Sequence, residues 1–346
     1  MKEKIKHLVK LGVFISLSLI LLYIAFRKVD LSEVLGILVH AEYSWVLLGL
    51  LAAILAYFVR ARRWILMIRP LGYDPPLRSV YHALMTGYLF NLALPRLGEL
   101  TRCVALGRKE KIPVDSLFGT VIAERAFDFI SMLIIMFVMI LGRGNTMDSF
   151  LKRNILQPAG DRVSSALDTS LLLVIILLVS LALAVLMMYI YRERLKKIKL
   201  LSKAGNIMKG IFTGLKTFTR MKDKLEFIFH TLLMWSLYIV MTWVILYAIP
   251  STSHLHFGDA VFLLVIGTLG MSAPVQGGIG AFHWIISRGL SVVYDIDLSE
   301  GLAYATLSHE SQLLLIALLG TISFYIIMGR GGKNKVNMQK EDGIKE

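Results

Sequence analysis

The sequence predicts an all-α integral membrane protein with about six full transmembrane helices, two re-entrant helical hairpins and, as a further hypothesis, an inverted repeat. Of the 346 residues, 56% are hydrophobic and only 18% are charged, which excludes disorder, a disulfide scaffold and an ordinary cytosolic enzyme. Six stretches stay apolar for about 20 residues, the length that crosses a hydrocarbon core of about 30 Å. The formal net charge is nevertheless +14, so the position of the basic residues has to be explained.

The predicted spans are residues 9–27, 44–66, 117–142, 170–191, 229–249 and 302–328. The Lys-rich start of the first span resembles a signal peptide, but no small-x-small cleavage site follows, so we expect it to stay uncleaved. Three other apolar segments are too short or too interrupted for confident spans, and they supply the hairpins: 79–94, 257–273 and 279–294. Residues 1–328 then form one membrane domain with halves at about 9–142 and 170–328.

The basic residues indicate the orientation of these spans. If segment 79–94 re-enters the membrane without crossing it, one side of the membrane carries 1–10, 60–115, 192–228 and 329–346, which hold 30 of the 38 Lys and Arg residues. Such a bias marks the cytoplasmic side, so both termini are predicted to be cytoplasmic. No nucleic acid is needed to explain the charge.

Two cytoplasmic segments have no predicted part in the activity. Segment 192–228 is basic, and from 206 onward its apolar residues recur every three or four positions, which fits a helix lying on the anionic leaflet and equally a solvated linker helix. Residues 329–346 are predicted to be a disordered tail.

Several chemistries are excluded by what the sequence lacks. The single cysteine, Cys103, excludes an intrachain disulfide and a Cys-based metal cluster. His254 and His256 offer two metal ligands in a predicted outer loop, fewer than a site needs, so no metal or other cofactor is predicted. Because there is no Walker loop, dinucleotide fingerprint or recognisable nucleophile motif, we expect the chain not to be an enzyme.

The third span carries Glu124, Arg125 and Asp128. Charged residues at the centre of a span cost about 2.5–3.5 kcal/mol each by insertion scales, so they need a partner or a purpose. On a helix, Glu124 and Asp128 share a face, and Arg125 reaches Asp128 at i+3. The turn is one positive charge short of neutral, and another element or a proton has to supply it.

A helix break just upstream supplies candidates. Pro95 and Gly98 interrupt the end of segment 79–94, close to Asn91. Broken helices at membrane depth occur only where protein or a water-filled cavity covers them. We therefore expect six charged residues to converge on one polar cavity that contacts a ligand: Arg96, Glu99, Arg102, Glu124, Arg125 and Asp128. The alternative is a purely structural ion-pair network.

The second half of the chain has a similar interruption. Pro274 and Gly277 repeat the P-x-x-G spacing, in the run that also holds Gln276, Gly278 and Gly280. Under the predicted topology the two hairpins enter from opposite sides, which is the pattern of an inverted repeat.

A polar patch in the last span contains His309 and Glu310, and His283 follows the glycine-rich turn closely enough to approach it. These groups suggest a proton-coupled step. The alternative is that they hydrogen-bond within the helix bundle.

Four motifs in this order resemble the flippase-like transmembrane domain of lysylphosphatidylglycerol synthase and its stand-alone relatives, from about residue 10 to 328. They are Arg60-Ala-Arg-Arg63-Trp64, Asn91 with Pro95-x-x-Gly98-Glu99-x-x-Arg102, Glu124-Arg125 with Asp128, and Pro274-x-x-Gly277-Gly278-x-Gly280. The chain departs from many relatives in having His283 where an acidic residue follows the glycine-rich turn. The soluble aminoacyl-transferring domain is absent, so aminoacylation is not implied.

The resemblance implies a protein of a prokaryotic cytoplasmic membrane that binds and translocates a lipid with a phosphate-containing or polar head group, such as a phospholipid or a polyprenol-linked lipid. In this reading Arg96, Arg102 and Arg125 contact the phosphate, while the backbone of Gly277, Gly278 and Gly280 allows its close approach. One alternative is a non-transporting scaffold or regulator of a lipid-modifying or glycosyltransferase enzyme, with the basic cytoplasmic segment 192–228 as its docking surface. A membrane-embedded transferase using His283, or His309 with Glu310, is a third reading.

Overall fold

A computed structural model describes residues 29–93, 97–151, 221–272 and 275–329, together with residues 16, 20, 22, 23, 25 and 26. All regular structure within these residues is helical. The first half contains α2 (Leu31–Val39), α3 (Tyr43–Ile68), the short 3-10 helix η1 (Arg69–Leu71), α4 (Leu77–Ala93), α5 (Leu97–Glu110) and α6 (Val114–Leu151). The second half contains α11 (Lys224–Leu246), η3 (Pro250–Thr252), α12 (Phe257–Met271), η4 (Gln276–Gly278), α13 (Ala281–Tyr294) and α14 (Leu298–Gly329).

The helix ends follow local sequence signals. Asp30 caps α2, because its side chain accepts a hydrogen bond of 2.9 Å from the Ser32 amide. Pro70 and Gly72, which has a φ of +88°, end the first long helix, and α4 starts directly after Pro76. Pro113 precedes the first residue of α6 in the same way.

Three of the described helices are long and apolar enough to cross a membrane: α3 with its 3-10 extension, α11 and α14. They coincide with the predicted spans 44–66, 229–249 and 302–328. Helix α6 covers the predicted span 117–142 but is not among these three candidates. Predicted span 170–191, most of span 9–27, segment 192–220 and tail 330–346 lie outside the described residues.

The described helices follow the same order in both halves: a long helix, a pair of shorter helices and another long helix. The shorter helices α4, α12 and α13 coincide with the three segments predicted for hairpins, 79–94, 257–273 and 279–294. Helix α4 packs against α5, and α12 packs against α13. The inverted orientation of the halves and the re-entry of these pairs into a membrane stay predictions.

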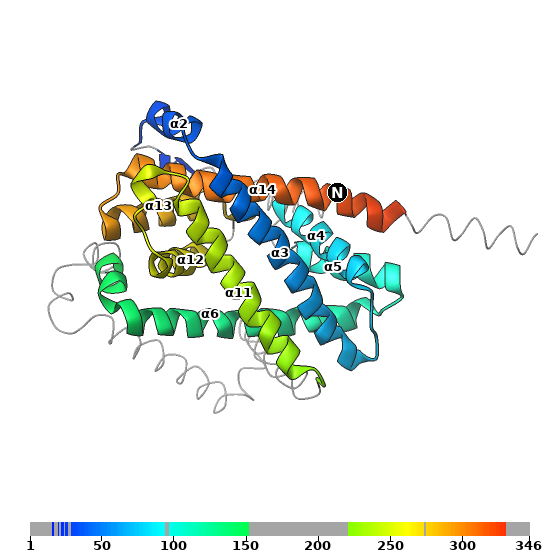
Figure 1. Ribbon diagram of the computed structural model, residues 1–346. Helices are drawn as coiled ribbons and strands as arrows, with labels where there is room; N and C mark the ends of the chain where they lie inside the picture. The colour runs from blue at the N-terminus through cyan, green and yellow to red at the C-terminus, as the bar shows by residue number, and fades with distance from the viewer. Residues whose placement is uncertain are drawn as a thin grey trace, which may run out of the picture.

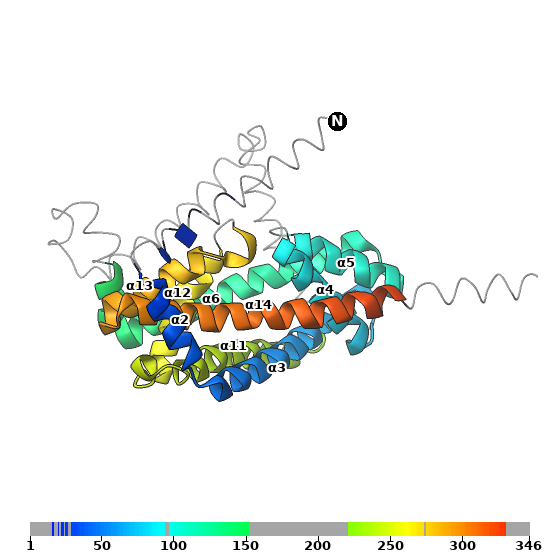
Figure 2. The same ribbon diagram turned by 90° about the horizontal axis from the view of Figure 1, so that it is seen from above.

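Helices α3 and α11 pack side by side and, in Figure 1, run diagonally across one side of the bundle from the level of α14 at the top to that of α6 at the bottom. The pair α4–α5 lies at one end of the bundle and the pair α12–α13 at the other, as both views show (Figure 2). Helix α14 runs along the whole bundle and contacts both pairs. Glycines permit this close packing, because a Cβ added at Gly301 would meet Ser287, and one added at Gly320 would meet Leu89.

Large apolar side chains are exposed along the outside of the long helices. On α14 they are Leu314, Leu318, Ile322 and Tyr325, and on α3 they are Leu47, Leu51 and Leu55. Continuous apolar surface of this kind suits contact with lipid chains rather than with water.

Candidate functional site

Five charged side chains meet between α3, α5 and α6, and we call them the arginine cluster: Arg60, Arg63, Arg102, Glu124 and Asp128. Arg60 donates from Nε to Glu124 Oε1 at 2.9 Å and from Nη2 to Asp128 Oδ2 at 3.1 Å. Arg102 Nη2 donates to the other oxygen of Glu124 at 2.9 Å. Arg63 donates to Asp128 Oδ1. Each carboxylate is thereby held by more than one guanidinium.

The arginine cluster is deeply buried. Arg63 and Glu124 are 0% exposed and Arg102 is 3% exposed. Aromatic rings form its walls: the Arg102 guanidinium lies 4.5 Å from the centre of the Trp64 ring, and Arg63 lies 5.8 Å from that of Phe227. In such an environment, unpaired charge is costly, so the balance of charges within the cluster matters.

Positive charge exceeds negative charge in the arginine cluster. Three guanidiniums face two carboxylates, a formal excess of one positive charge. Among the described residues, Nε and Nη1 of both Arg63 and Arg102 are buried without a hydrogen-bond partner. Guanidinium donors in this state suit an anion with several acceptor oxygens, such as a phosphate.

A second ion pair lies beside the arginine cluster. Arg125 Nη2 donates to Glu99 Oε1 at 2.9 Å, and the Arg125 side chain is 46% exposed. Arg125 therefore pairs with Glu99 on α5. Asp128, its predicted partner, is bound by Arg60 and Arg63 instead. Together with the Arg102–Glu124 bond, this pair joins α5 to α6.

The predicted cavity residues divide into three groups. Glu99, Arg102, Glu124, Arg125 and Asp128 lie in the two neighbouring ion-pair groups described above, while a ligand cavity around them stays a prediction. Asn91 instead holds the break between α4 and α5, because its Oδ1 accepts a 2.7 Å hydrogen bond from the Gly98 amide. Arg96 lies outside the described residues, as do Pro95 and Pro274.

Arg60 and Arg63 are the site residues that the sequence reasoning missed, although both belong to a quoted motif. The sequence does contain a signal for them. Two arginines three residues apart at the end of an apolar helix share one face, and both need a partner for the same reason as Glu124 does.

The glycine-rich turn of the second half contacts the first helix pair. Gln276 Nε2 donates a 2.9 Å hydrogen bond to the carbonyl oxygen of Ala93, the last residue of α4. Gly277, Gly278 and Gly280 have φ values of +57°, +79° and +83°, which only glycine adopts at low cost. The two interruptions, far apart in the sequence, thus meet in the fold.

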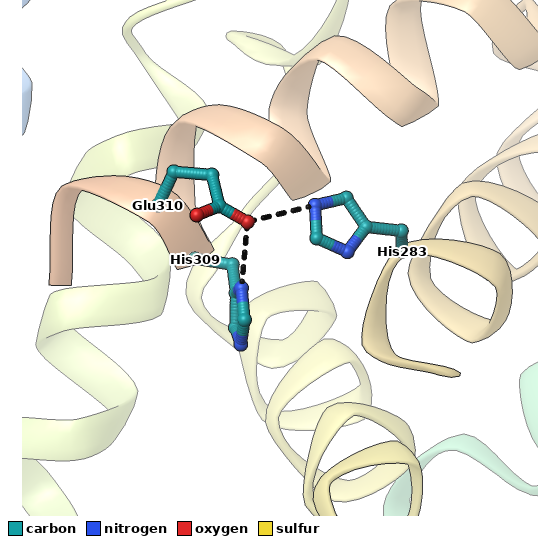
Figure 3. A group of neighbouring side chains, drawn as sticks. All are labelled: His283, His309 and Glu310. Atoms are coloured by element: carbon teal, nitrogen blue, oxygen red, sulfur yellow. Dashed lines mark hydrogen bonds and ion pairs between the residues drawn. The ribbon is translucent and has the colours of Figure 1, made fainter. Parts of the chain in front are cut away.

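His283, His309 and Glu310 also come together, as their predicted role requires (Figure 3). Glu310 Oε1 lies 3.4 Å from His283 Nε2 and 3.2 Å from His309 Nδ1. His309 Nε2 makes a 2.8 Å hydrogen bond to the Gly277 carbonyl oxygen. Both imidazoles are buried, and the Glu310 side chain is 42% exposed.

Comparison with known proteins gives a match over residues 9–320 to the family described as the lysylphosphatidylglycerol synthase TM region. The chain belongs to this family. Membership, together with the apolar helices, establishes a multi-pass membrane protein of the lysylphosphatidylglycerol synthase TM family.

One relative in this comparison is the UPF0104 membrane protein MJ1595 of Methanocaldococcus jannaschii. It is 26% identical over 128 residues, which cover 36% of this chain and 38% of that protein. The aligned part thus spans well under half of the relative. No solved structure matches the chain.

Proposed function

We propose that this protein binds a lipid with a phosphate-containing head group at the arginine cluster and moves that lipid across the cytoplasmic membrane of a prokaryote, with both of its own termini in the cytoplasm. The observation that carries the proposal is the buried excess of guanidinium groups, with donors on Arg63 and Arg102 that lack a partner among the described residues. Membership of the lysylphosphatidylglycerol synthase TM family supports the choice of a lipid as ligand.

A phosphate fits the arginine cluster better than a neutral or cationic group does. One added negative charge would balance the three guanidiniums against the two carboxylates. Phosphate oxygens accept paired hydrogen bonds from a guanidinium, and such charge-assisted bonds are about twice as strong as neutral ones. The exposed Arg125 and its partner Glu99 would lie on the approach to the cluster.

Movement of the lipid is supported by the contact between the two interrupted helix pairs. Transporters place their substrate sites at the interface of repeated halves, beside discontinuous helices. Here the Gln276–Ala93 hydrogen bond joins the turn of one pair to the end of a helix in the other. We propose a transporter and not an enzyme. The scaffold alternative, with a lipid-modifying enzyme as partner, rests on segment 192–228, most of which lies outside the described residues.

The test compares two neighbouring arginines of α3. Arg63→Gln makes the cluster charge-balanced and removes the unpartnered guanidinium donors of Arg63, while those of Arg102 remain and Asp128 keeps its bond to Arg60. Losing a hydrogen bond to a charged group costs about 1.5–3 kcal/mol. We therefore expect at least about tenfold weaker binding of phosphatidylglycerol or a polyprenyl phosphate, measured by native mass spectrometry, and a matching loss of fluorescent-lipid transport in liposomes.

Arg62→Gln is the control, because Arg62 is about one-third exposed and pairs with Glu226 outside the cluster. It should bind and transport lipid as the wild type does. Wild-type binding by the Arg63→Gln protein would overturn the proposed site. Anionic-lipid binding without any transport by the wild type would overturn the transport part and favour the scaffold.

A further inference from the structure

The three side chains His283, His309 and Glu310 present one ligand atom each to a common point. The two ring nitrogens and the carboxylate oxygen all lie within 4.8 Å of one another (Figure 3). They come from two helices, with His283 on α13 and the other two on α14. The loop pair His254 and His256 is not part of this group.

The hydrogen-bond pattern of His309 leaves a place for a cation. A carbonyl oxygen can only accept, so the 2.8 Å contact with Gly277 puts the ring hydrogen of a neutral His309 on Nε2. Its Nδ1 lone pair then faces the Glu310 carboxylate at 3.2 Å. Two acceptors at this distance repel each other unless a proton or a metal ion lies between them. A backbone carbonyl holding the far ring nitrogen is also the usual support of a metal-binding histidine.

The two distances to Glu310 are also those expected between ligands of one metal ion. Charge-assisted hydrogen bonds to a carboxylate measure about 2.7–2.9 Å, whereas Glu310 Oε1 stands 3.2 and 3.4 Å from the two nitrogens. Ligands about 2.0–2.2 Å from a tetrahedral ion lie about 3.4 Å apart. We infer that His283, His309 and Glu310 bind a divalent transition-metal ion of the Zn²⁺ class.

The surroundings make this a site with an open position. The Phe282 ring stacks on His309 with centroids 5.0 Å apart, and both imidazoles are buried, so the ligands on one side are fixed. Glu310 is partly exposed and leaves the other side accessible. Three protein ligands with an open fourth position characterise zinc sites that bind a further group. To bind an ion through Nε2, His283 has to carry its ring hydrogen on Nδ1. Nδ1 can then no longer accept the weak 3.4 Å contact from the Gly280 amide.

The sequence predicted the approach of His283 to His309 and Glu310 but no metal site, because the geometry of ligands 26 residues apart depends on how their helices pack. The inference is independent of the proposed lipid transport. A bound ion would fix α13 to α14 and, through His309, would hold the Gly277 carbonyl in place.

The test uses the full chain, freed of any histidine tag, stripped with a chelator and dialysed. Titration with Zn²⁺ in detergent, followed by calorimetry and elemental analysis, should give about one ion per chain. His309→Ala and Glu310→Gln should each weaken binding at least about tenfold. His254→Ala removes an exposed histidine outside the group and should bind as the wild type does.

Two outcomes overturn the inference. If the wild type binds no Zn²⁺, the three groups form a hydrogen-bonded cluster and no metal site. If Zn²⁺ binding is unchanged in the variants, the ion lies elsewhere. Should His309→Ala fail to give a monodisperse protein, Glu310→Gln decides alone, because that half-exposed side chain keeps its size and loses only its charge.

Discussion

Replacing Glu124 with glutamine is expected to cause a large loss of stability, about 3–5 kcal/mol, the cost of breaking a buried ion pair by removing one partner. Glu124 is 0% exposed, and both of its oxygens accept from guanidiniums, those of Arg60 and Arg102. The neutral amide in place of this carboxylate would leave three buried arginines facing Asp128 alone. Thermal unfolding in detergent, followed by size-exclusion chromatography, measures the effect.

Glu226→Gln is the matched control. Glu226 also accepts from an α3 arginine, Arg62, at 2.7 Å, but both side chains are about one-third exposed. Exposed pairs contribute about 0.2–1 kcal/mol, so this variant should unfold close to the wild type. An equal fall in stability for the two variants would show that burial of the arginine cluster contributes nothing to the free energy of unfolding. Phosphatidylglycerol should stabilise the Glu124→Gln protein more than the control, because ligand binding to the folded state raises its stability.

Gly98→Ala is expected to destabilise the protein by about 3 kcal/mol, at the upper end of overpacking costs. A Cβ at this position would collide with the carbonyl oxygen of Gly87 on α4 and with the Asn91 side chain. Backbone atoms cannot rotate away, so α4 and α5 would have to separate. Since α5 carries Glu99 and Arg102, lipid binding should fall together with the unfolding temperature.

Gly119→Ala in α6 provides the comparison. A Cβ there meets nothing within 4 Å, and alanine favours a helix over glycine by about 0.5–1 kcal/mol. Its unfolding temperature should stay the same or rise. Equal unfolding temperatures of the two alanine variants would mean that the close approach of α4 and α5 does not stabilise the helix break between them.

The long apolar stretches could be predicted from the sequence, because a hydrophobic run of about 20 residues has few other solutions. The break after α4 was equally accessible through Pro95 and Gly98. Local patterning does not, however, reveal which helices pack together. The partners of Glu124 and Asp128 were sought in the adjacent hairpin, and two of the three guanidiniums come from α3, more than 60 residues earlier.

The same limit explains the Arg125 pairing. Spacing along α6 places Arg125 near Asp128, but α5 offers it Glu99 across the helix interface. In the second half, the approach of His283 to His309 followed from a short turn after Gly280. The hydrogen bond between His309 and the Gly277 carbonyl could not be predicted from the sequence, because it depends on the positive φ values of the glycine turn.

The separation of the cluster partners along the chain has a consequence for biosynthesis. Helix α3 brings Arg60 and Arg63 to the membrane about 64 residues before Glu124 is made. At 5–20 residues per second this delay lasts roughly 3–13 seconds. Arg60 and Arg63 lie near the end of the apolar helix α3, so during that interval their side chains can reach the membrane surface but have no carboxylate partner. The arginine cluster can therefore form only after α6 has emerged, and a nascent chain arrested before α6 should lack this buried contact between α3 and α6.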